Sequence, residues 1–245
     1  KPQFDGASPF CADGLAIVKV DGKRGYIDTT GAFVIEPQFG FAWDFSNGLA
    51  HVQAGGEGGK WGYIDKTGTF VIEPKFSYAE YHRNGLARVT VKVKDRYMNG
   101  YIDTTGAFVI EPQFIRSWAF SNGLAAVEVD EKWGYIDKTG AFVIEPQFGL
   151  AWDFSNGLAW VMGDDDKFGC IDKTGAFVIK PQFFYVYEFS ADGLALVMDG
   201  GKWGYIDKTG SFVAEPQFDT ASRFSNGLAA VEVDGKWGYI DKTGN

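Results

Sequence analysis

Short runs of alternating hydrophobic and polar residues recur along this chain. In residues 227–233 (Gly-Leu-Ala-Ala-Val-Glu-Val), one alanine and two valines at alternate positions share one face, while the intervening alanine and glutamate share the other. An alternation with a period of two is typical of a half-buried β-strand. Asp234-Gly235 follows, and this dipeptide favours a tight hairpin turn. We therefore predict a second, antiparallel strand over residues 236–241.

The second strand leads into another turn and a third strand. The turn Asp-Lys-Thr-Gly suits a type I turn followed by a left-handed glycine, with the aspartate accepting hydrogen bonds from the turn's own backbone. A third strand follows, as in residues 142–145 (Phe-Val-Ile-Glu). We expect it to end at Pro146, because proline has no N–H for the strand ladder. A linker such as residues 218–226 completes the unit, and its apolar residues at every third position predict an irregular segment or a short helical turn.

This unit is repeated along the whole chain. Its Gly-Tyr-Ile-Asp signature begins at Gly25, Gly62, Gly100, Gly134, Gly169 (as Gly-Cys-Ile-Asp), Gly204 and Gly238. The period is about 35 residues, and a period of roughly 20–50 residues is typical of repeat proteins, whose units bury their apolar faces on one another. We predict an all-β fold in which residues 1–245 form a single array of seven three-stranded antiparallel meanders.

Two architectures satisfy such an array: a propeller-like ring and an open superhelical stack. Residues 227–245 are as apolar as the other units, whereas the end of an open array needs a polar cap. This favours a closed ring or a longer parent chain, and of the two architectures we favour the ring. In a ring the linker would serve as a minimal fourth strand of each blade. Residues 1–4 (Lys-Pro-Gln-Phe) resemble residues 180–183, and residues 242–245 stop before an expected third strand. The array is therefore expected to be truncated within a repeat at both ends.

Composition and charge exclude several partners. The chain has 23 basic and 32 acidic residues, a balance that argues against nucleic acid, which is bound by basic surfaces. No apolar run approaches the roughly 18 residues of a membrane span, so we expect no membrane insertion. Cys11 and Cys170 occupy different places in the repeat, and we interpret both as buried fillers. A low number of cysteines is compatible with both the cytosol and secretion. We favour a soluble, secreted or surface-exposed protein over a cytoplasmic one.

Three sequence blocks recur in fixed order over nearly the whole chain: Lys-Trp-Gly-Tyr-Ile-Asp-Lys-Thr-Gly, Phe-Val-Ile-Glu-Pro-Gln-Phe and Phe-Ser-Asn-Gly-Leu-Ala. They closely resemble the WG (KWG) repeat family of bacterial proteins. The Trp-Gly pair itself stands at Trp61, Trp133, Trp203 and Trp237, and Arg24, Asn99 and Phe168 replace its tryptophan in the other units. The resemblance implies a non-enzymatic interaction module, and it carries over no catalytic residue and no cofactor.

The polar residues favour structure over catalysis. One aspartate recurs at the start of each Asp-x-Thr-Gly turn, and among these we interpret Asp65, Asp137, Asp207 and Asp241 as structural repeat residues. A calcium site needs several oxygen ligands in one loop, whereas each turn offers a single carboxylate. A glycosidase needs one particular pair of carboxylates with divergent pKa values, whereas this array repeats one environment. We therefore expect no metal site and no enzymatic activity.

The tryptophans are the best functional lead, because the side chain suits both packing and binding interfaces. Trp61, Trp133, Trp203 and Trp237 recur in the second strand, where we expect them to pack between units. The candidates for contact with a ligand or partner are Trp43, Trp118, Trp152 and Trp160. Our hypothesis is a non-catalytic module for protein–protein interaction or structural assembly, with a protein partner or self-assembly. The alternative is lectin-like carbohydrate binding, with one aromatic pocket per repeat.

Overall fold

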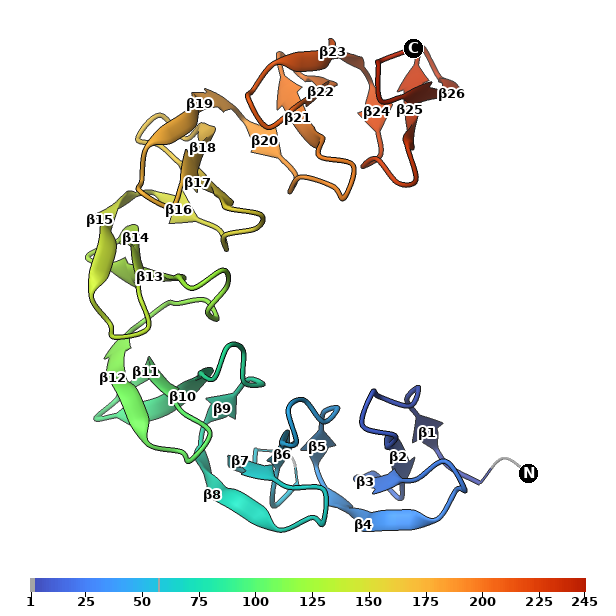
Figure 1. Cartoon of the computed structure of the whole chain (residues 1–245), viewed down its shortest axis with the longest axis vertical. Coiled ribbons are helices and arrows are strands. Elements are labelled where there is room, and N and C mark those ends of the chain that lie inside the picture. The colour runs from blue at the N-terminus through green and yellow to red at the C-terminus, as the bar shows by residue number, and fades with distance from the viewer. Residues whose placement is uncertain (1–2, 57) are drawn as a thin grey trace. The chain divides into compact units, whose positions relative to one another are not determined.

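A computed structural model describes residues 3–56 and 58–245 of the chain. Over these residues the protein is all-β, and its strands form seven consecutive antiparallel sheets without a helix (Figure 1). This confirms the predicted fold class. Within the described part of the chain there is accordingly no helix that could cross a membrane. The match proposed for residues 1–4 falls partly on residues 1 and 2, which lie outside the described residues.

Each sheet is built on a hairpin of two long strands. The first long strands are β2 (Ala16–Val20), β6 (Ala50–Gln53), β10 (Ala87–Val93), β13 (Ala125–Val129), β17 (Leu158–Met162), β21 (Ala195–Asp199) and β25 (Leu228–Val233). The second long strands are β3 (Lys23–Ile27), β7 (Trp61–Ile64), β11 (Arg96–Ile102), β14 (Lys132–Ile136), β18 (Phe168–Asp172), β22 (Lys202–Ile206) and β26 (Lys236–Asp241). Asp234 and Gly235 have φ angles of 51° and 74°, as the tight turn requires.

In five of the seven sheets of the described structure, a third long strand and a short strand flank this hairpin on opposite sides. The third strands are β4 (Phe33–Phe39), β8 (Phe70–Phe76), β12 (Phe108–Phe114), β15 (Phe142–Phe148), β19 (Phe177–Phe183) and β23 (Phe212–Phe218). The short strands are β1 (Gly6–Ala7), β5 (Phe41–Ala42), β9 (Tyr78–Ala79), β16 (Leu150–Ala151), β20 (Tyr185–Val186) and β24 (Thr220–Ala221). We number the sheets in chain order: sheet 1 is β1–β4, sheet 2 β5–β8, sheet 3 β9–β12, sheet 4 β13–β15, sheet 5 β16–β19, sheet 6 β20–β23 and sheet 7 β24–β26.

The third strand does not end at its proline, so that prediction was wrong. Strand β15 runs through Pro146 to Phe148, and a register shift separates its pairs with Tyr135 and Trp133 of β14. Proline is tolerated because β15 is the last strand of its sheet, and because at the bulge the pairing with β14 needs no N–H donor from this position. The same bulge explains Gly134, since a Cβ atom there would lie 2.5 Å from the Ile144 carbonyl oxygen.

The linker is not a helical turn. In sheet 5 it forms the short strand β16, in which Ala151 pairs with Val161 of the first long strand. A tight turn follows, in which Ser155 and Leu158 exchange backbone hydrogen bonds of 2.8 and 3.1 Å. Asn156 and Gly157 have the positive φ angles of this turn, 52° and 83°. The linker thus supplies a short fourth strand, as expected of a blade in a propeller-like ring.

The chain divides into two compact units, one comprising Lys1–Phe120 with Lys138–Gly140 and the other Ser121–Asp137 with Ala141–Asn245. Within each unit, neighbouring sheets share an apolar core. In the second unit, one buried cluster joins Tyr135 and Phe148 of sheet 4 to Val161 and Ile171 of sheet 5. The predictions of a ring and of one array truncated within a repeat at both ends stay predictions.

Candidate partner-binding surface

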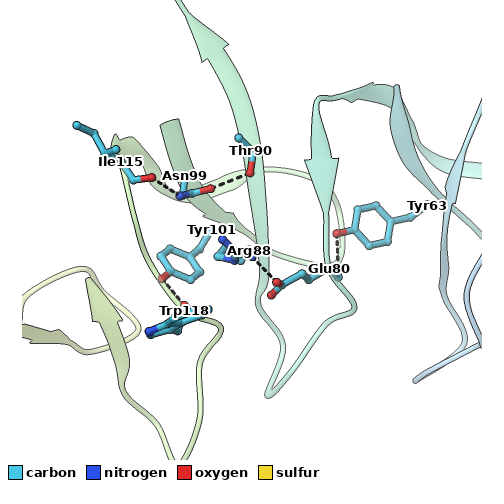
Figure 2. A network of polar contacts seen from close by, with 8 residues as sticks. All are labelled: Tyr63, Glu80, Arg88, Thr90, Asn99, Tyr101, Ile115 and Trp118. Atoms are coloured by element: carbon cyan, nitrogen blue, oxygen red, sulfur yellow. Dashed lines mark hydrogen bonds and ion pairs between the residues drawn. The ribbon is translucent and has the colours of Figure 1, made fainter. Parts of the chain in front are cut away.

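A repeated tyrosine of the second strand pins the linker that enters the next sheet. The hydroxyl of Tyr135 donates to the carbonyl oxygen of Trp152 at 2.7 Å. Figure 2 shows the same bond from Tyr63 to Glu80 and from Tyr101 to Trp118. Burial raises the pKa of Tyr135, so its hydroxyl stays protonated and donates. This bond fixes the backbone at one linker residue.

The residue at this linker position lies beside one residue of the first long strand, and its backbone N–H donates to the carbonyl oxygen of that residue. We call these two residues the linker–strand pair of the sheet. This holds also in sheet 6, where Cys170 stands in place of the preceding tyrosine. The pairs are Ser8 with Ile17, Trp43 with His51, Glu80 with Arg88, Trp152 with Trp160, Tyr187 with Leu196 and Ser222 with Ala230. The backbone geometry repeats, while the side chains change from sheet to sheet.

In sheet 2 the linker–strand pair is an aromatic stack. The Trp43 side chain is 54% exposed, and its ring lies 5.7 Å from that of His51 at an interplanar angle of 13°. His51 is buried and also packs against Trp61 at 5.6 Å. Burial, and then the nearby His82, lowers the pKa of His51 to about 4. His51 is therefore neutral at neutral pH, and the exposed face of Trp43 carries no nearby imidazolium.

In sheet 3 the corresponding pair is ionic. The Arg88 guanidinium donates to the Glu80 carboxylate, and the two side chains are 16% and 23% exposed. Figure 2 shows the two groups joined by this contact. The ring of Tyr78, which is exposed, lies 5.8 Å from the Arg88 guanidinium carbon. The same backbone position thus presents a polar surface here.

In sheet 5 the structure corrects one predicted contact residue. Trp160 is only 3% exposed and stacks on Phe189, with ring centroids 5.6 Å apart and an interplanar angle of 9°. It lies opposite Cys170, which replaces the repeated tyrosine and whose pKa burial raises to about 12. Trp160 is therefore part of the core, and only its linker partner Trp152 is half-exposed.

The other tryptophans fall into two groups. Trp118, a predicted contact residue, is 44% exposed and lies in the linker after β12. Of the tryptophans expected to pack between units, Trp61 and Trp133 are buried and Trp203 is half-buried beside Tyr187. Trp237 is 60% exposed, because β26 is the last strand of sheet 7 and nothing in the described structure covers it. The expectation of packing is wrong for Trp237.

The repeated aspartates hold their own turns. The Asp65 Oδ1 atom accepts hydrogen bonds from the Thr67 backbone N–H at 2.8 Å and from the Thr67 hydroxyl at 2.6 Å. These bonds, the hydroxyl first, lower the pKa of Asp65. Asp207 and Asp241 bind Thr209 and Thr243 in the same way, and Asp137 accepts the Ala141 N–H at 3.1 Å. Within residues 3–56 and 58–245, no three His, Cys, Asp or Glu side chains are placed to hold a metal ion.

Sequence reasoning missed the exposed tyrosines and phenylalanines of the linkers, because it followed tryptophan alone. The exposed linker aromatics other than tryptophan are Phe10, Phe41, Tyr78, Tyr81, Phe184, Tyr185 and Tyr187. Their signal was present in the sequence as aromatic residues just after the third strand. A hollow of about 360 Å³ is lined, among others, by Ser8 of the linker before β2 and by Trp43 and Asp44 of the linker before β6.

Comparison with solved structures finds similar chains at low sequence identity. Similar structures include the computationally designed Ika8 protein (12% identity, 94% of this chain and 81% of that chain covered, TM-score 0.50). Others are BamB from Moraxella catarrhalis (11%, 96% and 83%, TM-score 0.47) and the WD40 beta propeller domain of Doa1 (11%, 96% and 93%, TM-score 0.39). At such identities a likeness concerns the fold alone.

A comparison with curated proteins found no match. The family described as WG containing repeat matches residues 1–23, 25–57, 61–92, 100–133, 133–167, 168–203 and 203–237. These seven matches cover most of the sequence. The chain therefore belongs to the WG containing repeat family.

Proposed function

We propose that this chain is a non-catalytic module that binds a protein partner through its linker–strand pairs and the exposed aromatics of its linkers. The observation that carries the proposal is that the repeats share one backbone geometry but differ in the side chains of their linker–strand pairs. Tyrosine hydroxyls and aspartate turns keep the backbone the same, while the pair side chains range from Trp43 with His51 to Glu80 with Arg88. Protein interfaces are enriched in tryptophan, tyrosine and arginine.

The surface also has the exposure that binding requires. In the first unit the residues Trp43 and Trp118 are 54% and 44% exposed. In the second unit Tyr185 is 63% exposed. Large aromatic side chains cost free energy when they face water, and a partner that covers them recovers it.

Substitutions on the linkers test this proposal. We expect the immobilised chain to retain a specific protein from an extract of its source organism. Calorimetry with that protein, once purified, should show binding weakened by roughly tenfold or more in Trp43→Ser or Tyr185→Ser, as at binding hot spots. Val71→Ser and Val178→Ser remove exposed apolar side chains of the third strands and serve as controls. Equal losses in the controls, or none in the linker variants, would contradict the proposal. A second copy of this chain as the retained protein indicates self-assembly through the same surface.

Carbohydrate binding is the second candidate, and one observation favours it. The hollow of about 360 Å³ beside Trp43 combines an aromatic wall with the carboxylate of Asp44, a pairing suited to a sugar ring and its hydroxyl groups. A glycan array probed with the chain, Trp43→Ala and Trp152→Ala distinguishes the two functions. Tight glycan binding that both variants lose would replace the protein-partner proposal.

A further inference from the structure

Sheet 1 differs from the other sheets in the charge of one cross-strand pair. Lys19 of β2 pairs directly with Arg24 of β3, and Lys23 precedes Arg24. The pairs at this register in the other sheets are Gln53 with Trp61, Thr90 with Asn99, Glu128 with Trp133, Met162 with Phe168, Met198 with Trp203 and Glu232 with Trp237. Two like charges directly opposite each other destabilise a sheet, so a bound anion would relieve this position.

The Arg24 guanidinium is held in place by its surroundings. It donates to the Gly40 carbonyl oxygen, and its carbon lies 4.4 Å from the centre of the Phe41 ring. A positioned guanidinium loses little freedom when it binds a carboxylate, which suits it to anion recognition. Within the described residues, no carboxylate forms an ion pair with Lys19, Lys23 or Arg24.

Two adjoining hollows meet at these cations. One, of about 410 Å³, is lined by Lys19, Lys23 and Arg24 together with backbone of Gly22, Gly40 and Gly56. Of the residues that the structure describes, Asp21 also lines it, so three cations face one carboxylate there. The other is the hollow of about 360 Å³ beside Trp43, which shares Lys19 and Arg24 and adds the apolar side chains of Ile17 and Ala42. Asp44 lies at this second hollow.

We infer that this double hollow binds an acidic segment of the partner protein, with a carboxylate between Lys19 and Arg24 and a following apolar side chain against Trp43 and Ile17. This inference rests on the proposed function and adds the chemistry of the partner. An extended peptide supplies a carboxylate and an apolar side chain within two residues, about 7 Å. An acidic polysaccharide supplies the carboxylate without the apolar side chain. The site is a local basic patch on a chain of net charge −9.

The test uses the peptide acetyl-Glu-Glu-Leu-Leu-amide as the probe, titrated into the ¹⁵N-labelled chain at low salt. We expect saturable shifts of the Gly22, Gly40 and Gly56 amide signals, and weaker binding as salt screens the charges. Arg24→Trp should weaken binding by roughly tenfold or more. This variant restores the Trp-Gly pair found at Trp133 and Trp203, so it is expected to fold. Asp21→Asn should strengthen binding.

Matched arms separate the alternatives. Lys92→Met removes one exposed cation of sheet 3 and should leave binding of the acidic probe unchanged. The neutral probe acetyl-Gln-Gln-Leu-Leu-amide should not bind. No saturable binding, an equal loss in Lys92→Met, or equal binding of tetragalacturonate would overturn the inference. The protein-partner proposal fails separately, when the Trp43→Ser and Tyr185→Ser variants keep the partner that the chain retains.

Discussion

Sheets 4 and 5 fill the same core position with side chains from different strands. In sheet 4, Tyr135 of the second strand packs against Phe154 at 4.7 Å, and its cross-strand neighbour is the small Ala126. In sheet 5 the second strand carries the small Cys170, and Trp160 of the first strand supplies the aromatic ring that stacks on the linker phenylalanine. The two sheets keep one large and one small residue in each pair.

This exchange shows which part of the repeat is interchangeable. The core needs an aromatic ring against the linker phenylalanine, and either strand of the hairpin can provide it, because volume-conserving changes are tolerated in cores. The hydrogen bond is not interchangeable. The Tyr135 hydroxyl donates to Trp152, whereas Cys170 has no hydroxyl and the buried Trp160 Nε1 has no partner in the described structure.

The largest expected effect is at Trp160. Trp160→Ala leaves a cavity beside Cys170 and should lower the free energy of unfolding by about 4 kcal/mol. Adding Cys170→Tyr recreates the arrangement of sheet 4 and should recover more than half of that loss. Urea unfolding followed by circular dichroism measures both. A double variant no more stable than Trp160→Ala would show that the two sheets are not equivalent.

Removal of one hydroxyl sharpens the comparison. Tyr135→Phe keeps the ring and removes the donor to the Trp152 carbonyl, so we expect a loss of about 1 kcal/mol. Tyr205→Phe, which removes the bond to Ser222, is the matched change in sheet 6. Hydrogen exchange should show faster opening of the linker after sheet 4 in Tyr135→Phe. Unchanged stability in both variants would mean that the bond positions the linker without stabilising it.

The aspartate turn is common to both sheets and should respond to pH. The Asp172 Oδ1 atom accepts from the Thr174 hydroxyl at 2.6 Å and from its N–H at 2.8 Å, which lowers the pKa of Asp172 from its ordinary 3.8. Its contribution is present above that ordinary value and is lost as pH falls through the lowered pKa of the folded state. Asp172→Ala should lower the melting temperature by about 2 °C at pH 7.

The pH profile supplies the control for this turn. The difference in melting temperature between the chain and Asp172→Ala should shrink as pH falls below 3.8, because protonation removes the same acceptor charge. Asp137→Ala should lower the melting temperature similarly at pH 7, since sheet 4 has the same turn. A difference that stays constant down to pH 2 would assign the effect to packing of the turn and not to the charge of the carboxylate.

The smallest expected effect is at the contact between the turns of the two sheets. The Lys173 ammonium of sheet 5 donates to the Asn122 carbonyl oxygen at 2.6 Å, just before sheet 4. Lys173 is exposed, so Lys173→Met should cost only about 0.5 kcal/mol. Calorimetric unfolding measures this change. A loss as large as that of Tyr135→Phe would show that this surface contact holds the sheets together more strongly than its exposure indicates.

Local residues were enough to predict the hairpins and their turns. Alternation marked the first strand, and Asp-Gly and Asp-x-Thr-Gly marked the turns, because these signals act within a few residues. The proline inside β15 could not be read in this way. A strand can continue through proline only where the neighbouring strand does not need an N–H donor at that position. In β15 the bulge opposite Gly134 removes this need.

The candidate surface was predicted only in part. Trp43 and Trp118 are exposed, whereas Trp160 is buried, because the pairing of β17 with β18 places it over Cys170. The partner assigned to these residues stays a proposal. Trp237 shows the converse, since the same residue type as Trp133 is exposed where no third strand covers it.

By itself the sequence determined the period, the all-β class, the order of the three long strands and their turns, and the family. These follow from signals that lie close together in the chain and recur in each repeat. The tertiary structure alone decided which aromatic rings lie in the core and which face water. That choice depends on cross-strand register and on the volume of the opposing residue, as at Tyr135 and Trp160, and both are set by residues distant in the chain.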